Sequence, residues 1–290
     1  MGDVDNREDI RAFLMSRRAK VSPAEVGLPA GGSRRVPGLR RIEVAMLADV
    51  SVEYYSRLER GDAAGVSESV LDAIAGALRL DDAERRHLYD LVRAAGSTRA
   101  PRRPRPAVRV RPTVQQVLDA MTGAAALVTN GRLDHLASNA LGNALFSPIS
   151  AAGGGTPNSA RFTFLDPRAP VFLRDWDQAA DNTVAILRAE AGRDPYDRSL
   201  SDLVGELSTR SGEFRTRWAA HDVRIHASGT KRLHHPEVGD LEVSYESMPL
   251  PDHGQNLIVY VAAPGTTSYD ALRLLASCAA TTDAVHPADR

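Results

Sequence analysis

The chain has 290 residues with a formal net charge of −1, 43% hydrophobic residues and 25% charged residues, which is typical of a globular protein of about two domains. No apolar run is long enough to cross a bilayer, and the acidic N-terminus lacks the apolar stretch of a signal peptide. We therefore expect a cytoplasmic protein without membrane insertion. Cys278 is the single cysteine, which excludes an intrachain disulfide and a multi-cysteine zinc site.

Positive charge is concentrated in the front of the chain. Residues 1–112 carry 21 Lys and Arg against 16 Asp and Glu, whereas residues 113–290 carry 15 against 21. A basic front joined to an acidic rear is typical of a nucleic-acid-binding module attached to a second domain. Because the basic excess is small, we expect a modest affinity for DNA that falls steeply with salt.

The first predicted element is a helix over residues 6–20, in which Ile10, Phe13 and Leu14 share one apolar face. A Gly- and Pro-rich extended connection follows and carries Arg34 and Arg35 near its end. These two arginines could contact phosphates, or they could belong to a solvated loop, and the sequence leaves both interpretations open.

Residues 39–61 predict two short helices joined by a tight turn. Apolar residues recur near helical spacing as far as Ala48, and Asp49 interrupts the pattern. Ser51 is a good N-cap for the second helix, because its hydroxyl can accept a bond from a free N–H there. Gly61 lies where that helix is expected to stop. Two such helices form a helix-turn-helix, whose second helix lies in the DNA major groove.

The candidate DNA-binding residues lie at the starts of these two helices and in the preceding loop. At the second helix, Arg57 can pair with guanine, Glu53 can accept from cytosine, and Val52 can touch a thymine methyl. Guanidinium groups at the start of the first helix can hold phosphates. An ordinary helical hairpin with a solvated charged face remains the alternative. The candidates are Arg34, Arg35, Arg40, Arg41, Ser51, Val52, Glu53, Tyr54 and Arg57.

The segments LRRIEVAMLADVS (39–51) and YYSRLERG (54–61) resemble the Xre-type helix-turn-helix regulators. The run before them, residues 21–41, resembles the subfamily that carries an MmyB-like ligand-binding domain. This resemblance implies a lambda-repressor-like, all-α domain of five helices. Asp49 and Ile42 depart from the family pattern, which usually has Gly and Glu there. Asp tolerates left-handed backbone, so we expect the turn to form with some strain.

Two further helices complete the predicted front domain. Ser67 predicts the N-cap of a helix over residues 69–80, and an acidic pair at 81–82 predicts the start of a helix that runs to residue 95. Residues 97–112 then carry six arginines, four prolines and no acid, which is typical of a stiff linker. The charge of this linker could add non-specific phosphate contacts, or the segment could be a mere spacer.

The rear of the chain predicts an α+β domain. Two short apolar runs flank Asn130 and Gly131, which is a strong signal of a β-hairpin. Residues 147–160 are expected to be a flexible loop. Helices are predicted over 114–121, 138–146, within 161–191, over 200–207, 214–218 and 267–276, and strands over 223–227, 241–248 and 257–263. This order predicts a mixed sheet with helices packed on one side.

The order of these elements resembles a PAS-like domain with an antiparallel sheet. The segments FLDP (164–167), WAAHDV (218–223), HPEVGDLEVSYESMPLP (235–251) and IVYVAAPGT (258–266) resemble the MmyB-like ligand-binding domain. Ser138 departs from that pattern, which usually has an aromatic there. The resemblance implies a helix-turn-helix domain over 1–96, a linker over 97–112, a PAS-like domain over 113–280 and a flexible tail over 281–290.

The same resemblance implies a small apolar or fatty-acyl-like ligand, bound between the sheet and the helices. For each large side chain, an ordinary place in the apolar core is the alternative, because aromatic residues at core spacing usually fill a core. The candidate pocket residues are Phe146, Phe172, Trp176, Trp218 and Tyr245.

A catalytic or metal-binding function receives little support. Five histidines cluster near the rear strands, with several acids close in sequence, but no pair has the spacing of a helical metal motif. A Gly-rich phosphate loop and a nucleophile elbow are absent from the sequence. We therefore predict no enzyme activity, no cofactor and no metal. The histidines considered are His221, His226, His234, His235 and His253.

Together these observations predict a sequence-specific transcriptional regulator, cytoplasmic and associated with the nucleoid, that binds double-stranded DNA as a homodimer. A small ligand in the rear domain would change the spacing or mobility of the two DNA-binding heads. Two alternatives remain open. One is a helix-turn-helix used to dock a partner protein, and the other is a sensory-domain enzyme with an accessory DNA-binding module.

Overall fold

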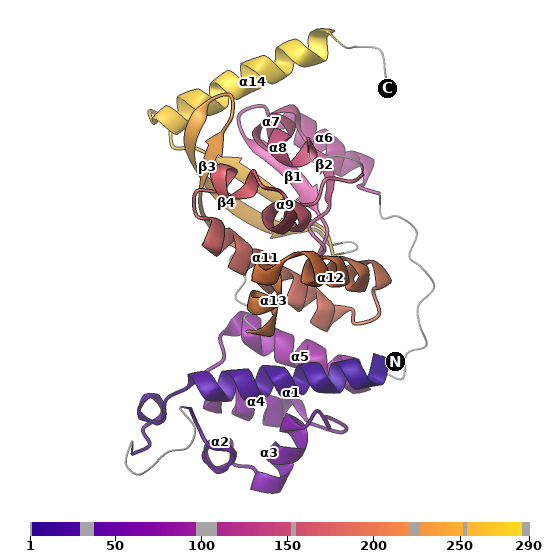
Figure 1. Ribbon diagram of the computed structural model, residues 1–290, viewed down its shortest axis with the longest axis vertical. Helices are drawn as coiled ribbons and strands as arrows, with labels where there is room; N and C mark the ends of the chain where they lie inside the picture. Colours follow the sequence, from indigo (N-terminus) through magenta and orange to yellow (C-terminus); the bar gives the residue numbers. More distant parts are fainter. Residues whose placement is uncertain are drawn as a thin grey trace. The chain divides into compact units, whose positions relative to one another are not determined.

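The computed structural model describes residues 2–29, 38–96, 109–151, 155–220, 227–251 and 254–285 (Figure 1). The chain divides into two compact units. The first unit comprises Met1–Arg103, Arg188–Asp202 and Thr216–Arg224, and the second comprises Pro104–Leu187, Leu203–Arg215 and Ile225–Arg290. Among the residues described, none of the helices is long and apolar enough to cross a membrane.

Five α-helices form the described N-terminal part of the first unit. They are α1 (Gly2–Lys20), α2 (Arg41–Leu47), α3 (Val52–Glu59), α4 (Glu68–Ala77) and α5 (Asp82–Gly96). A short 3₁₀ turn, Pro23–Val26, occupies part of the connection that the sequence predicted to be extended. All five helices contribute to one apolar core, with Phe13, Val44, Tyr55, Ile74 and Leu88 fully buried. The prediction of a five-helix domain is confirmed.

The turn between α2 and α3 has the conformation that the sequence predicted. Asp49 lies in the left-handed region at φ 52°, where an L residue is strained, although Asp tolerates this better than most. Ser51 caps α3, because its hydroxyl oxygen accepts a bond from the backbone N–H of Tyr54 at 3.0 Å. Both predictions, at Asp49 and at Ser51, are confirmed.

The second unit contains a five-stranded sheet in the order β2-β1-β5-β4-β3, antiparallel throughout (Figure 1). Its hairpin of β1 and β2 confirms the signal at Asn130, whose side-chain oxygen accepts from the N–H groups of Arg132 and Asp134. The strands are β1 (Ala125–Thr129), β2 (His135–Ser138), β3 (Ser228–His235), β4 (Gly239–Pro249) and β5 (Asn256–Val261).

One described strand of the rear sheet was not predicted from the sequence. Most of the predicted strand over 223–227 lies outside the described residues, and β3 occupies residues 228–235. Its register with β4 pairs Lys231 with Val243 and Leu233 with Leu241. The basic and histidine-rich composition of β3 has weak intrinsic β propensity, so the sequence does not indicate a strand there. Pairing with β4 compensates for that weak propensity.

The remaining helices follow the predicted order, with additions. They are α6 (Pro112–Ala120), α7 (Ala140–Leu145), α8 (Ser147–Ser150), α9 (Ser159–Leu165), α10 (Ala169–Phe172), α11 (Trp176–Arg193), α12 (Arg198–Arg210), α13 (Gly212–Ala219) and α14 (Thr267–Val285). The expectation of a flexible loop over 147–160 is wrong for α8 and for the start of α9. Pro148 lies in the first turn of α8 and is buried with Ile149, and the Asn158 side chain caps α9.

Both faces of the sheet are covered. On one face, residues such as Leu127, Leu233 and Val243 pack against helical residues from α7 to α10 and from α14. On the other face, Ala126 and Val128 pack with two residues of α6. The sequence predicted helices on one side, and α6 adds cover on the second. This explains why every residue of β1 is buried.

Candidate nucleic-acid interface and ligand pocket

The start of α3 presents the predicted reading residues on its accessible side. Tyr55 and Leu58 face the core, whereas Glu53 and Arg57 are exposed and Tyr54 is partly buried. The guanidinium of Arg57 lies 5.2 Å from the centroid of the Tyr54 ring. This stacking orients the arginine without burying it, and leaves its donors accessible for base edges.

A second partner of Arg57 is weak enough to be displaced. Its Nε lies 3.7 Å from a carboxylate oxygen of Asp62, and both side chains are 47% exposed. An exposed ion pair of this kind contributes about 0–1 kcal/mol, so a guanine or a phosphate can replace it at little cost. The geometry therefore suits a DNA-contacting arginine.

A buried carboxylate joins the end of α3 to the two helices beside it. Glu59 is 1% exposed, and Arg18 of α1 donates to its oxygens at 2.7 and 3.3 Å. Arg41 donates to the same carboxylate from Nε at 3.0 Å. Arg18 also donates to the Leu39 carbonyl oxygen at 2.8 Å. These bonds hold α3 in a fixed position relative to α1 and α2.

This network changes how the predicted phosphate contacts are understood. Arg41 is committed in part to Glu59, but half of its side chain is exposed, so outward donors remain. Arg40 is exposed, and its backbone N–H donates to Glu43 at 2.6 Å. Arg34 and Arg35 lie outside the described residues. Phosphate contact by these four arginines stays a prediction.

The five aromatic residues predicted for the ligand site lie in different environments. Phe146 and Phe172 are buried in the apolar core, with ring centroids 6.4 Å apart. Trp176 donates from its indole N–H to the Thr163 carbonyl oxygen at 2.9 Å. Trp218 has the Arg188 guanidinium 4.2 Å from its ring centroid. Tyr245 lines the pocket described next.

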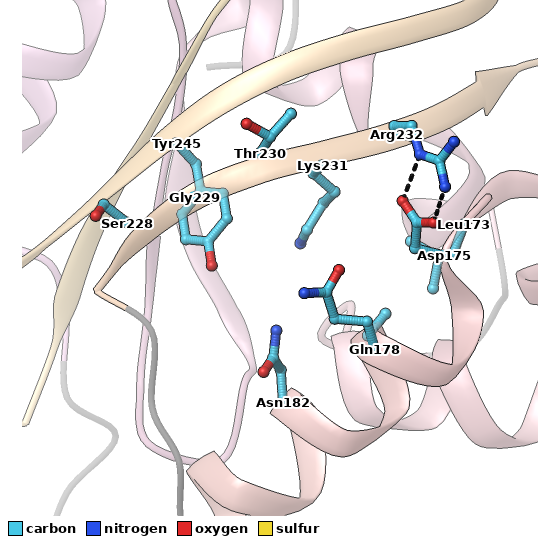
Figure 2. A pocket seen from close by; sticks show the side chains of 11 residues that line it. Leu173, Asp175, Gln178, Asn182, Ser228, Gly229, Thr230, Lys231, Arg232 and Tyr245 are labelled. Atoms are coloured by element: carbon cyan, nitrogen blue, oxygen red, sulfur yellow. Dashed lines mark hydrogen bonds and ion pairs between the residues drawn. The ribbon is translucent and has the colours of Figure 1, made fainter. Parts of the chain in front are cut away.

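A partly open pocket of about 130 Å³ lies in the second unit, between the inner face of the β3–β4 pair and the start of α11 (Figure 2). It is more polar than the resemblance implied, because amides, a hydroxyl and an amine face its interior. The sequence signal for it was weak: Lys231 is one of only two lysines in the chain, and no strand was predicted at its position. Its lining consists of Leu173, Asp175, Gln178, Ala179, Asn182, Ser228, Gly229, Thr230, Lys231, Arg232 and Tyr245.

Lys231 is the central charged group of this pocket. Its amine lies 5.7 Å from the ring centroid of Tyr245 and 5.6 Å from that of Tyr260. Burial lowers the pKa of Lys231 below the ordinary value of a lysine. Gly229 gives the Tyr245 ring its place, because a Cβ there would meet the ring and hydroxyl atoms at 3.2 Å.

The rim of the pocket carries a paired acid and base. Arg232 donates from Nε to Asp175 at 2.8 Å, and its second nitrogen bonds the other carboxylate oxygen (Figure 2). This hydrogen bonding lowers the pKa of Asp175. Asp175 therefore stays ionised and is neutralised by Arg232, so it supplies little negative charge to the pocket interior.

The described histidines make structural contacts. His135 bonds Ser159 at 2.7 Å, and its pKa falls to about 4 because it is buried and lies near the positive charge of Lys231. His234 bonds Asp240 at 2.8 Å, and His235 is fully buried. Within the described ranges, His, Cys, Asp and Glu form no group of three or more that could hold a metal. His221, His226 and His253 lie outside those ranges.

These features define a two-part class of protein: a DNA-binding transcription regulator with a separate ligand-sensing domain. The helix-turn-helix domain family matches residues 11–88, and the MmyB-like transcription regulator ligand binding domain family matches residues 110–275. The second match covers more than half of the chain, so the protein belongs to the family of MmyB-like transcription regulators. The resemblance seen in the sequence is confirmed. A search of curated proteins finds no match.

Proposed function

We propose that this regulator reads a specific operator in duplex DNA through the start of α3, and that it does so as a homodimer. The observation that carries the proposal is the anchored but accessible position of Arg57, stacked on Tyr54 and held on a helix that Glu59 fixes to its neighbours. A rigid helix with exposed donors at its start is the arrangement that direct readout in the major groove requires.

The regulatory part of the proposal is a population shift. A small ligand bound in the second unit would favour one arrangement of the paired DNA-binding domains over another, and so change the affinity for an operator with two half-sites. The domain limits of the proposal are 1–96, 97–112, 113–280 and 281–290. The proposal also includes a cytoplasmic location with the nucleoid and a small ligand with an apolar or fatty-acyl-like part. Leu173, Ala179 and Tyr245 supply apolar surface for that part.

The test is binding of the full chain to a duplex from the gene's own upstream region, with a scrambled duplex as control, across a salt series. We expect the native duplex to bind more tightly, and Arg57→Ala to reduce that preference by about 10-fold or more, since a good bidentate contact contributes about 1–3 kcal/mol. Light scattering of the free protein and of the complex measures the oligomeric state.

The matched control is Arg85→Ala. Arg85 is also a half-exposed, ion-paired arginine, bonded to Asp72 at 3.0 Å, but it lies on α5. Its removal should leave the preference for the native duplex unchanged. If Arg57→Ala and Arg85→Ala behave alike while both proteins remain folded, the helix-turn-helix does not read DNA through α3, and docking of a partner protein becomes the better interpretation.

A further inference from the structure

Lys231 occupies a position on β3 that is normally apolar. Side chains alternate along a strand, so Lys231 shares a face with Leu233 and His235, both of which are fully buried. Its partner on β4 is Val243, also fully buried. The strand therefore directs a long cationic side chain toward the inner face of the sheet, where a Leu or Val would ordinarily lie.

This cation has no anionic partner in the described structure. Within the ranges that the structure describes, no carboxylate lies at ion-pair distance from the Lys231 amine. The ammonium instead lies over the rings of Tyr245 and Tyr260. The nearest acid of the pocket, Asp175, is held by Arg232. Lys231 is only partly exposed at the wall of a partly open pocket, and a charge withdrawn from water without a partner is costly, so a lysine here needs a compensating role.

Three further polar groups converge on the same space as the amine. Figure 2 shows the side chains of Lys231, Gln178 and Asn182 and the hydroxyl of Tyr245 directed into the pocket. Gln178 and Asn182 are four residues apart on α11, so they lie on one face of that helix. An ammonium, two amides and a phenol provide several donors around one point, which is the surrounding that an oxyanion requires.

The size of the pocket limits the ligand. A cavity on the order of 150 Å³ in another protein holds one benzene molecule. The pocket at Lys231, of about 130 Å³, is close to this size, and the apolar surface of Leu173 and Ala179 borders it. It therefore suits a small organic group with one charged end, and a large polyanion such as a nucleotide does not fit inside.

We propose that this pocket binds a small organic carboxylate, whose carboxylate pairs with the Lys231 ammonium and accepts hydrogen bonds from Tyr245 and from the amides of Gln178 and Asn182. The inference rests on the proposed ligand-sensing function of the second unit, and it specifies the chemistry of the recognised head group. A carboxylate is favoured over a phosphate because one ammonium and neutral donors match a single negative charge.

Calorimetry on the full chain tests this proposal with a defined panel: acetate, butyrate, hexanoate and benzoate, each against its neutral amide, and inorganic phosphate. We expect at least one carboxylate to bind 10-fold or more tightly than its amide. Lys231→Met should reduce that binding 10-fold or more, and Lys231→Arg should retain most of it. The matched control is Lys20→Met, which removes the only other lysine, in α1.

The outcomes are distinct. Equal binding of acid and amide, binding unchanged in Lys231→Met, no binding by any carboxylate, or tighter binding of phosphate would each overturn the proposal. Circular dichroism of Lys231→Met checks its fold, and Lys231→Arg provides a second variant that keeps the charge. Duplex binding by the ligand-free proteins separates the two hypotheses. If Lys231→Met still binds the operator but no longer binds the carboxylate, both hypotheses are supported. If the wild-type protein shows no preference for the native duplex, only the DNA-reading function is contradicted.

Discussion

Arg18 and Glu59, 41 residues apart in sequence, form a nearly buried ion pair beneath the helix-turn-helix, with 2.7 Å between Arg18 Nη2 and Glu59 Oε1. Arg18 belongs to α1, and Glu59 is the last residue of α3. Because both charges are withdrawn from water, removing either partner leaves the other charge buried and uncompensated, which destabilises the fold. The position of the reading helix thus depends on a contact that lies outside the two-helix motif itself.

Replacing Glu59 with Gln should weaken the N-terminal helices markedly. The change keeps the shape of the side chain but leaves the Arg18 guanidinium buried without a counter-charge, a loss of about 3–5 kcal/mol. Hydrogen exchange of α1 and α3 amides in the full chain measures this locally, as a lower opening free energy. Glu53→Gln, on the exposed side of the same helix, serves as control and should change it by about 0.5 kcal/mol or less. Equal exchange in the two variants would show that the pair does not hold α3.

Replacing Gly61 or Gly76 with alanine should change the free energy of unfolding in opposite directions. Gly61 has φ +87°, and a Cβ there would meet the Arg7 carbonyl oxygen at 2.3 Å, so α1 or the turn must shift. Gly76 lies inside α4 with no atom within 4 Å of an added Cβ. We expect Gly61→Ala to destabilise by about 2 kcal/mol or more, and Gly76→Ala to stabilise by up to about 1 kcal/mol. Thermal unfolding followed by circular dichroism distinguishes them; a stabilising Gly61→Ala would contradict the close packing of α1 on this turn.

The helix-turn-helix could be predicted from sequence because its signals are local. Ser51 as an N-cap, Asp49 at a left-handed position and Gly61 after the last turn each act within a few residues, and all three are found as expected. The role of Glu59 could not be predicted in the same way, because its partners Arg18 and Arg41 come from other helices. Long-range pairing of charges leaves no periodic trace in the chain.

The ligand pocket, unlike the helix-turn-helix, could not be predicted from the sequence. Phe146 and Phe172 were predicted to line the ligand site, with a place in the apolar core as the alternative. Both lie in the core and neither lines the pocket at Lys231, because large apolar residues fill a core as readily as they line a cavity. Lys231 carried no pattern of its own, since one charged residue in a polar stretch is usually solvated. Only the pairing of β3 with β4 shows that this lysine faces inward, because register decides which face a side chain occupies.

The proposed carboxylate affinity should depend on pH through Lys231 alone. The groups facing its amine do not titrate near neutrality: burial raises the pKa of Tyr245 and Tyr260, and His135 is neutral above its pKa of about 4. Asp175 at the rim has a lowered pKa and is ionised against Arg232.

The sign of this dependence follows from the lowered pKa of Lys231. In the free protein the amine loses its proton at a lower pH than an ordinary lysine, and a bound carboxylate favours the charged form. Above the pKa of the free amine, binding must take up a proton, so affinity should fall up to about 10-fold for each pH unit. Calorimetry in two buffers of different ionisation enthalpy, from about pH 6 up to the ordinary lysine pKa of about 10.4, measures the proton uptake directly. Lys231→Arg should remove the dependence, since arginine stays protonated throughout; a slope unchanged in that variant would assign the titrating group elsewhere.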